Sequence, residues 1–503
     1  GIQLGTGSRS YGWRSSCCTH LYGVILIMGD FLSITVSVIG IFLILGAVMV
    51  ILNDNQDSGR KVAWILIIGI LPVIGLLLYI VFGMNFRKPG FFQYRNRQFL
   101  DLFEERTSQE TKDLLFDTVE EENIRPEYRS LSRLLKKDSG LTVTDNNEVE
   151  IITSGGRKLE ALVNDLLAAK HHIHFEYFYF LKDDGSKRIK NLLMQKAREG
   201  VKVRFIHENI ANITIWPGYY NEMKEAGVEV VKFTNPNSFL LSKFNYRDHR
   251  KIVVIDGKVG YTGGMNIGDD YFFRWRDTHT RITGNAVAAL QYCFLNSWIT
   301  SGGKIDGNFD VFFPQDRIAH DDKLVQIIPD EPDREFPILH LGALWTAHHA
   351  ERYLYIQTPY FVPPEPLMMA LKSAAFKGCD VRLMVPKKAD LFFMGPANKS
   401  FYKDCLEAGI RVFEKGGKFI HSKTMVSDDY LSIIGSANMD CRSMELSYEI
   451  NAYIYNEEIA KENYRIFMSD LKECSEVTLK EWGKRPWYHK ITQSIMRLFA
   501  PLL

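Results

Sequence analysis

Two long uncharged stretches stand out near the start of the chain. Residues 31–52 and 62–84 contain no Asp, Glu, Lys or Arg. As helices, each would be about 33 Å long, enough to cross the hydrocarbon core of a bilayer. Nine residues, most of them polar, separate the two stretches. We therefore predict a two-span transmembrane helical hairpin over residues 28–88 rather than a pair of buried core helices.

The residues around these stretches indicate where the native chain starts and which way it faces. Residues 1–27 look unlike the rest, and Met28 fits a natural start, so we interpret residues 1–27 as a non-native or disordered extension. The connection between the stretches carries Arg60 and Lys61, which two aspartates offset. Four basic residues follow the second stretch: Arg87, Lys88, Arg95 and Arg97. By the positive-inside rule, we predict a multi-pass protein of the inner membrane with its large C-terminal part on the cytoplasmic side.

Farther along, the hydrophobic pattern changes to that of a globular α/β protein. Residues 89–140 are charged and helix-prone, which predicts a solvated helical connector. After residue 150, short β-branched strands alternate with helical patterns, which predicts mixed sheets flanked by helices. The order of elements occurs twice; for example, Glu225-Ala226-Gly227-Val228 matches Glu407-Ala408-Gly409-Ile410. We predict two pseudo-symmetric lobes, residues 141–330 and 331–503.

Charge and cysteine content narrow the classes of function. With 61 Lys and Arg against 60 Asp and Glu, the net charge is +1, so no global field draws the protein to nucleic acid. The seven cysteines are odd in number and lack paired metal-ligand spacing, which is typical of reduced thiols. No acidic cluster has the spacing of Mg²⁺ or Zn²⁺ ligands. We predict no metal, no cofactor and no nucleic-acid partner.

The candidate catalytic residues lie in a motif that occurs once in each half of the duplication. Counting from each His, a Lys follows after 2 residues, an Asp after 7, a Gly after 14, an Asn after 17 and another acidic residue after 28. One such motif is a weak signal, but two in matched positions are a strong one. The first set is His249, Lys251, Asp256, Asn266 and Asp277; the second is His421, Lys423, Asp428, Asn438 and Glu449.

This combination suits the transfer of a phosphodiester group. Residues i and i+2 of a strand share a face, so the His and Lys of each motif point together, and two facing lobes bring both pairs into one pocket. One imidazole can attack phosphorus while the other protonates the leaving alcohol, through a covalent phosphohistidine. The lysines supply positive charge, and Asn266, Ser436 and Asn438 can donate hydrogen bonds to the non-bridging oxygens.

The four carboxylates have two different expected roles. Asp277 and Glu449 are candidates to bind the far ring nitrogen of each His, which would fix its tautomer and raise its basicity. Asp256 and Asp428 complete the catalytic motifs. They fall near strand ends, five residues beyond each Lys, so we expect them to hold a turn or a partner from the other copy.

The paired HxKxxxxD motifs, with the GGMN and GSAN segments that follow them, resemble the phospholipase D superfamily over roughly residues 150–503. The segments HFEYFYF, GGMNIGDDY, WRDTH, QTPYFVP and GSANMDCRS and the terminal PLL are similar to those of bacterial cardiolipin synthases. The resemblance implies condensation of two phosphatidylglycerol molecules to cardiolipin with release of glycerol. It also implies that His249 forms the phosphatidyl-enzyme and that His421 serves as acid and then as base.

The membrane features fit such a substrate, because a lipid with two acyl chains stays in the bilayer. The expected partners are phosphatidylglycerol and the lipid bilayer, with homo-oligomers left open. The C-terminal segment from Trp487 to Leu502 has apolar residues at helical spacing among basic ones, which predicts an amphipathic helix that is either interfacial or docked on the lobes. The nearest alternative activity is a phospholipase D or another phosphatidyltransferase that uses water or a different alcohol. The two spans disfavour a nuclease, and the two intact motifs disfavour a non-catalytic scaffold.

Overall fold

The computed structural model describes residues 13–53, 58–83, 89–117, 121–209, 211–212, 217–233, 246–316, 321–332, 334 and 336–500. The chain divides into two compact units, Gly1–Asn85 and Phe86–Leu503. Of the predicted extension over residues 1–27, the first twelve residues lie outside the described ranges, and the rest belong to a helix that begins at Trp13.

The N-terminal unit contains one long helix, α1 (Trp13–Asn53), and three shorter helical segments. Within α1, Ser33–Asn53 is long and apolar enough to cross a bilayer, with a mean hydropathy of 2.8. Among the described residues, this is the one helix that meets both conditions. The shorter segments are α2 (Ser58–Ile70), α3 (Pro72–Leu78) and the π-helical turn η1 (Tyr79–Gly83).

The second uncharged stretch does not form the single continuous span that its length predicted. The helix breaks at Leu71, whose φ of −129° and ψ of 75° are not helical, because the following Pro72 disfavours helical backbone at the residue before it. Helix α3 then packs against α2 so closely that a Cβ atom on Gly75 would lie 2.7 Å from the carbonyl oxygen of Ile67. With 13 residues, α2 is about 20 Å long and too short to cross a bilayer. The described residues therefore do not confirm a two-span hairpin.

The helices of residues 89–140 are not the solvated connector that their charge predicted. Phe99 and Phe103 are buried in the core of the second unit, and so are Leu131 and Leu135. Each pair is spaced by four residues, which places both side chains on one helix face. The charged residues occupy the opposite faces, so the segment packs as part of the second unit. Its helices are α4 (Pro89–Glu105), α5 (Gln109–Phe116) and α6 (Arg129–Ser139).

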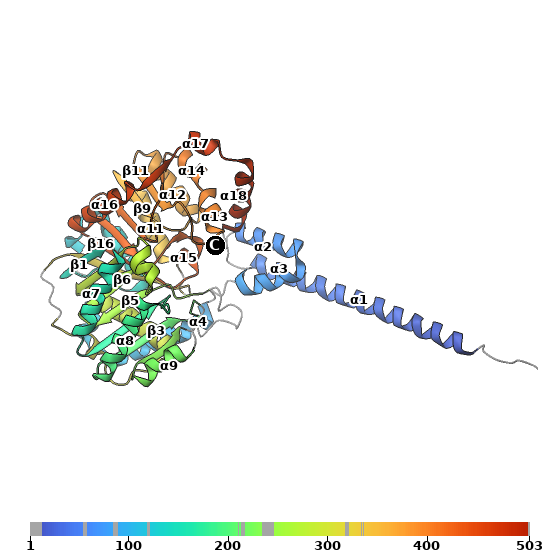
Figure 1. The fold of residues 1–503 in the computed structure, drawn as a ribbon, viewed down its shortest axis with the longest axis horizontal. Coiled ribbons are helices and arrows are strands. Elements are labelled where there is room, and N and C mark those ends of the chain that lie inside the picture. Colours follow the sequence, from blue (N-terminus) through green and yellow to red (C-terminus); the bar gives the residue numbers. More distant parts are fainter. Residues whose placement is uncertain are drawn as a thin grey trace, which may run out of the picture. The chain divides into compact units, whose positions relative to one another are not determined.

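The first lobe is a seven-stranded sheet in the order β1-β7-β6-β5-β2-β3-β4. Strands β2, β3 and β4 are parallel, whereas β5, β6, β7 and β1 pair antiparallel. Helices α7 and α8 cover one face (Figure 1), and α10, which is buried along most of its length, packs on the other. The strands are β1 (Asn147–Ile152), β2 (His172–Tyr177), β3 (Lys202–Glu208), β4 (Glu229–Phe233), β5 (Lys251–Ile255), β6 (Val259–Gly263) and β7 (His279–Gly284), and the helices are α7 (Gly155–Ala168), α8 (Asp184–Arg198), α9 (Pro217–Glu225) and α10 (Ala286–Thr300).

The second lobe repeats this arrangement in an eight-stranded sheet of order β17-β12-β11-β9-β13-β14-β16-β8. Helices α11 and α12 pack in the core on one face, and α16 packs on the other. The strands are β8 (Leu324–Asp330), β9 (Tyr353–Gln357), β11 (Asp380–Pro386), β12 (Arg411–Lys415), β13 (Thr424–Ser427), β14 (Leu431–Gly435), β16 (Glu449–Tyr455) and β17 (Cys474–Val477). The helices are α11 (Ile338–His349), α12 (Glu365–Phe376), α13 (Met394–Ser400), α14 (Tyr402–Glu407), α15 (Cys441–Glu445), α16 (Glu457–Leu471), α17 (Leu479–Gly483) and α18 (Trp487–Phe499), and a small parallel pair joins β10 (Phe361–Val362) to β15 (Met439–Asp440).

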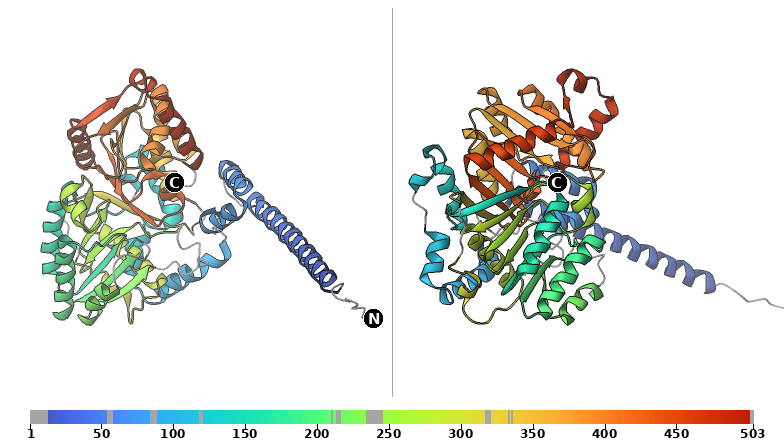
Figure 2. Two further views of the ribbon diagram at one scale, coloured as in Figure 1. Left: turned by 45° about the vertical axis from the view of Figure 1, so that its right-hand side comes forward. Right: turned by 60° about the vertical axis from the view of Figure 1, so that its left-hand side comes forward.

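The predicted α/β fold with two pseudo-symmetric lobes is confirmed. The run β7-β6-β5-β2-β3-β4 of the first sheet corresponds to β16-β14-β13-β9-β11-β12 of the second. The two lobes lie against each other in both views of Figure 2, and one buried apolar cluster includes Ile252 and Ile282 of the first sheet with Ile434 and Ile450 of the second. Strand β8 precedes the boundary expected at residue 330 but pairs with β16, so it belongs to the second sheet.

Candidate active site

His249 lies just before β5, where the first lobe meets the second. Its Nδ1 is 3.0 Å from both carboxylate oxygens of Glu449 and 3.1 Å from the carbonyl oxygen of Ser436, all in the second lobe. With its proton on Nδ1, the imidazole keeps a lone pair on Nε2. Phe178 packs edge-on against the ring, with 4.8 Å between the centroids.

His421 occupies the matching position before β13 and forms the reciprocal pair. Its Nδ1 is 2.7 Å from Oδ2 of Asp277, which belongs to the first lobe. Tyr271 and Trp275, also from the first lobe, pack against the ring with centroid distances of 5.5 and 5.3 Å. The 28-residue offset thus identified both carboxylates, but each one serves the histidine of the other lobe.

Two short backbone bridges between the lobes align these pairs. In one, the amide of His249 donates to the carbonyl of Tyr448, and the amide of Tyr448 donates to Arg247, both at 2.9 Å. In the other, the amide of His421 donates to the carbonyl of Arg276, and the amide of Arg276 donates to a backbone carbonyl of the second lobe, both at 2.8 Å. Each bridge sets a histidine beside the residue that precedes its carboxylate partner. The same local pairing therefore builds both halves of the site.

The residue that follows the first motif glycine is Gly264 in the first lobe and Ser436 in the second. This difference changes the surroundings of the two carboxylates. A Cβ atom on Gly264 would lie 2.2 Å from Oδ1 of Asp277, so only glycine leaves room for that carboxylate. Ser436 stands at the equivalent position and donates its hydroxyl proton to Glu449 at 2.5 Å. Its single proton is thereby used, which makes Ser436 a support for Glu449 rather than the phosphate donor that the sequence predicted.

Lys251 and Lys423 are buried within the same centre, with 0% and 4% of their surfaces exposed. The ammonium of Lys423 donates to the carbonyl of His421 at 2.5 Å, and Lys251 makes the same contact with His249. Burial lowers the pKa of Lys251 to about 7, although the negative charge of Glu449 acts to raise it. Burial likewise lowers the pKa of Lys423 to about 8. Because a bound anion would offset this loss of hydration, the centre that holds the two lysines favours an anionic ligand.

The two histidine pairs differ electrostatically. Burial and the charges of both lysines lower the pKa of His249 well below its ordinary value. Burial and the charge of Lys423 lower the pKa of His421 to about 4. Burial raises the pKa of Glu449 to about 7. Burial acts in the same sense on Asp277, but the charges of His421 and Lys423 outweigh it and lower its pKa. Asp277 is therefore the firmer anion of the two.

The predicted asparagines are both buried in the centre but differ in what they can donate. Nδ2 of Asn438 is 3.3 Å from the hydroxyl of Ser443. Oδ1 of Asn266 accepts from the amide of Tyr179, while its Nδ2 has no hydrogen-bond partner among the described residues. A buried donor without a partner is costly, so Asn266 is the better placed of the two to bind a phosphate oxygen.

The motif aspartates do not join the histidines. Asp256 lies at the other end of β5 from Lys251, about 17 Å along the strand. Its carboxylate accepts three backbone amide protons, from residues 170, 171 and 172, at 2.8, 2.8 and 2.9 Å. Asp428 does the same for residues 351, 352 and 353 at 2.8, 2.9 and 3.0 Å. Both therefore hold the turn before the neighbouring strand, as expected from their positions near strand ends, and neither contacts a motif histidine.

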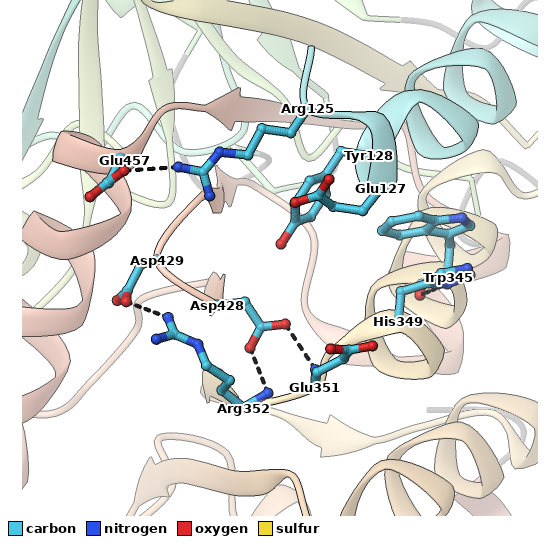
Figure 3. Close-up of a pocket in the computed structure, with 10 residues that line it drawn as sticks. All are labelled: Arg125, Glu127, Tyr128, Trp345, His349, Glu351, Arg352, Asp428, Asp429 and Glu457. Carbon is cyan, nitrogen blue, oxygen red and sulfur yellow. Dashed lines mark hydrogen bonds and ion pairs between the residues drawn. The ribbon is translucent and has the colours of Figure 1, made fainter.

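A cavity of about 480 Å³ opens beside Asp428, away from the histidines and lysines. Figure 3 shows the Asp428 carboxylate turned toward the backbone of Glu351 and Arg352 at the edge of this cavity. Ion pairs between Arg125 and Glu457 and between Arg352 and Asp429 occupy its rim. The cavity thus lies beside the structural aspartate Asp428, and neither motif histidine nor motif lysine lines it.

Several residues of the site carried no motif that sequence reasoning detected. Lys158, on α7, is fully buried beneath the centre and donates to the carbonyl of Met265 at 2.7 Å. Arg442, on α15, lies close enough to His249 for its charge to lower the pKa of that histidine further. Tyr271 and Trp275 fall in the GGMNIGDDY and WRDTH segments, which contributed to the family resemblance but had been given no role.

Known proteins are similar to this chain in sequence and in fold. Residues 162–298 and 345–471 match a family model described as "Cardiolipin synthase, PLD-like domain", and residues 41–83 match one described as "Phospholipase D-nuclease N-terminal". The major cardiolipin synthase ClsA of Bacillus subtilis (strain 168) is 35% identical over 484 residues, which cover 94% of this chain and 99% of the relative. A cardiolipin synthase of Geobacillus sp. (strain WCH70) is 34% identical over 481 residues, covering 94% of each chain.

The crystal structure of a phosphatidylserine synthase from Haemophilus influenzae Rd KW20 matches with a TM-score of 0.55 and 14% identity, covering 75% of this chain and 97% of the other, and it shows the fold alone. The family match covers both lobes, and the sequence identity extends over nearly the whole length of the chain. This chain therefore belongs to the phospholipase D-type cardiolipin synthase family.

Proposed function

We propose that this protein is a cardiolipin synthase that transfers a phosphatidyl group from one phosphatidylglycerol to a second one and releases glycerol. The observation that carries the proposal is the pair of crossed histidine–carboxylate contacts, His249 with Glu449 and His421 with Asp277, around two buried lysines. Transfer of a phosphodiester group needs a nucleophile, a proton donor and positive charges around the phosphate oxygens. This centre supplies all three. The names of the relatives supply the product, cardiolipin.

In the first step, Nε2 of His249 attacks phosphorus, and the bond from phosphorus to the glycerol oxygen breaks. Burial and the charge of Lys423 lower the pKa of His421 to about 4 without substrate, and the negative charge of the bound phosphodiester offsets this effect so that His421 carries a proton. His421 gives that proton to the glycerol oxygen, so neutral glycerol leaves and a phosphatidyl–histidine remains. In the second step, the terminal hydroxyl of another phosphatidylglycerol gives its proton to His421 and attacks phosphorus. The phosphorus–nitrogen bond then breaks, which releases cardiolipin and restores both histidines.

The difference between the two carboxylates supports this division of roles. A proton donor passes through an imidazolium, which a firmly charged neighbour stabilises. The pKa of Asp277 is lowered, whereas that of Glu449 is raised to about 7, so His421 has the better partner for that task. The low pKa of His249 keeps its Nε2 unprotonated and nucleophilic.

The membrane arrangement completes the proposal. Ser33–Asn53 anchors the enzyme to the bilayer that holds its substrate. The basic residues after the second uncharged stretch support a cytoplasmic position for the catalytic unit. A second crossing remains a prediction, because α2 and α3 are each too short to span the bilayer.

The test is to incubate the full chain in vesicles with phosphatidylglycerol labelled in the acyl chain and in the terminal glycerol. We expect cardiolipin and free glycerol in equal amounts, and neither product from His249→Ala or His421→Ala. Phosphatidic acid as the sole lipid product would replace the proposal with a phospholipase D. Substantial transfer by either variant would rule out the shared site.

A further inference from the structure

Helix α18 is held on the second lobe by one face. Gln493 and Ala500 are buried, Met496 packs against the apolar core, and Arg497 donates to the carboxylate of Asp404 at 2.8 Å. These four helix positions are spaced by three, four and seven residues, so they share one side of the helix. Figure 1 shows α18 running beside α13 on this lobe. Helix α18 therefore docks on the catalytic unit.

The opposite side of α18 is also apolar and faces outward. Trp487, Ile491, Ile495 and Leu498 are 71%, 50%, 47% and 68% exposed. Their spacing of four, four and three residues places them in one line along the helix, opposite the docked side. We call these four residues the outer stripe. A water-facing helix side would carry polar residues here, so the stripe indicates a binding surface.

The charge beside the outer stripe indicates what this surface contacts. Residues 480–497 contain five basic residues and one acidic residue. Tyr488, next to Trp487, is 54% exposed, and such aromatic residues gather at the level of lipid headgroups. Basic residues around an apolar stripe attract anionic lipids and leave the apolar side chains to enter the acyl-chain layer. The basic residues are Lys480, Lys484, Arg485, Lys490 and Arg497, and the acidic one is Glu481.

The loop that leads into α13 continues the exposed apolar surface toward the active site. Leu391 and Phe392 are 43% and 91% exposed. In the same loop, Asp390 accepts a hydrogen bond from Tyr360 at 2.7 Å, and its charge acts on Lys423 in the catalytic centre. The exposed loop residues thus lie next to residues that border the site.

The first lobe contributes a matching apolar residue to the same border. Phe273 is 55% exposed and sits in the π-helical turn η5 (Asp270–Arg274). Its neighbours in the chain, Tyr271 and Trp275, both pack against His421. Exposed apolar side chains therefore flank the catalytic centre on both lobes.

We propose that the outer stripe of α18 and Phe392 insert into the surface of an anionic bilayer and hold the active site against the lipid layer. The occupant is a lipid surface because it alone supplies both an apolar phase for the stripe and negative charge for Lys480, Lys484, Arg485 and Lys490; Arg497 is paired with Asp404 on the docked side. The proposal rests on the proposed function for its substrate, since a lipid that need not leave the bilayer can reach a site held at its surface. A second copy of the chain and the N-terminal unit are the competing occupants.

The first experiment measures insertion without using catalysis. The full chain is reconstituted into phosphatidylglycerol-containing vesicles whose acyl chains carry bromine, which quenches tryptophan fluorescence only at short range. The difference in fluorescence between the wild type and Trp487→Phe isolates the contribution of Trp487. We expect the bromolipid to quench this difference strongly. An unquenched difference would show that protein covers the stripe and would overturn the proposal.

The second experiment separates docking from chemistry. For Ile491→Glu/Ile495→Glu, we expect transfer on vesicles to fall about tenfold or more, because two charges cannot enter the acyl layer. Transfer on dihexanoyl phosphatidylglycerol below its micelle concentration should change less than about twofold, because that substrate needs no docking. Leu167→Glu is the matched control, since Leu167 is also 50% exposed but lies on α7. It should leave both activities unchanged.

Other outcomes of the second experiment are equally decisive. Unchanged transfer on vesicles by the double variant overturns the proposal. An equal loss on both substrates also overturns it, because the loss would then lie in folding or chemistry. If the wild type makes no cardiolipin, the proposed function fails, but the quenching of Trp487 still tests the docking surface independently.

Discussion

Asp277 of the first lobe accepts a hydrogen bond from His421 of the second lobe over 2.7 Å, across a separation of 144 residues in the chain. Glu449 returns the same contact to His249 from 200 residues away. Each lobe thus supplies the carboxylate for the other lobe's histidine. The site exists only when the lobes are packed together, and the two carboxylates differ in strength as anions.

The first prediction concerns the two carboxylates. Asp277→Asn should lower kcat by about 10³, because an amide holds the His421 tautomer poorly and does not stabilise its imidazolium. Glu449→Gln should lower kcat by only about 10 to 10², because the raised pKa of Glu449 shows that this carboxylate is easily neutralised. Steady-state transfer in vesicles measures both values. A larger loss in Glu449→Gln would reverse the assigned histidine roles, and equal losses would contradict the difference between the two carboxylates.

The second prediction is a decline of activity at high pH. The pKa of Lys423 is lowered to about 8, so its ammonium is lost as the pH rises through that value and phosphate binding weakens. KM should therefore rise above about pH 8. Lys423→Arg keeps its charge at any such pH, so its KM should stay flat there, even if kcat is lower. A wild-type KM that is constant to pH 10 would contradict this prediction.

The same shift predicts a trend in stability. Between pH 8 and the ordinary lysine value of 10.5, the unfolded chain binds more protons at Lys423 than the folded chain does. The free energy of unfolding should therefore contain a contribution that rises with pH over this window. Urea titrations at several pH values measure the free energy of unfolding of the wild type and of Lys423→Met. The difference between their pH dependences gives the contribution of Lys423, because the variant lacks this group.

The third prediction concerns Arg250, which lies between the motif His and Lys. Its guanidinium is buried and paired with Glu176, Asp248 and Glu331 at 3.2–3.3 Å. Arg250→Met should lower the free energy of unfolding by about 3–5 kcal/mol, because it leaves buried carboxylates without a counter-charge. Urea titration of the full chain in detergent measures this change.

The control for Arg250 is Arg411→Met. Arg411 pairs with Glu476 at 2.8 Å, but both side chains are about two-fifths exposed. Its loss should cost about 0–1 kcal/mol. If the two variants unfold alike, the buried cluster does not hold the start of β5.

The fourth prediction separates the motif aspartates from the chemistry. Asp256→Ala and Asp428→Ala each leave three backbone amides without an acceptor, so each should destabilise the chain by about 2–4 kcal/mol. At a temperature where the variants are folded, kcat should stay within about threefold of the wild type, because neither carboxylate reaches the histidines. A loss of about 10³ in kcat with normal stability would return these residues to the catalytic set.

Part of the fold was predictable because its signals are local. The alternation of strand and helix patterns, the duplication and the motif spacing each depend on residues near one another in the chain, and they predicted the two lobes and the histidine, lysine and carboxylate sets. Two errors also had local signals. Pro72 interrupts the second uncharged stretch, and Phe99 with Phe103 marks an apolar face in the supposed connector.

The remaining features depend on tertiary packing. No spacing rule states that Asp277 serves His421, that Ser436 gives its proton to Glu449, or that β8 crosses to the second sheet. Those outcomes follow from how the lobes bury their shared core and align their backbone bridges. The sequence by itself determined which residues could perform the chemistry. Tertiary structure alone decided which residues meet, because burial and contacts between distant segments set each group's partner and charge.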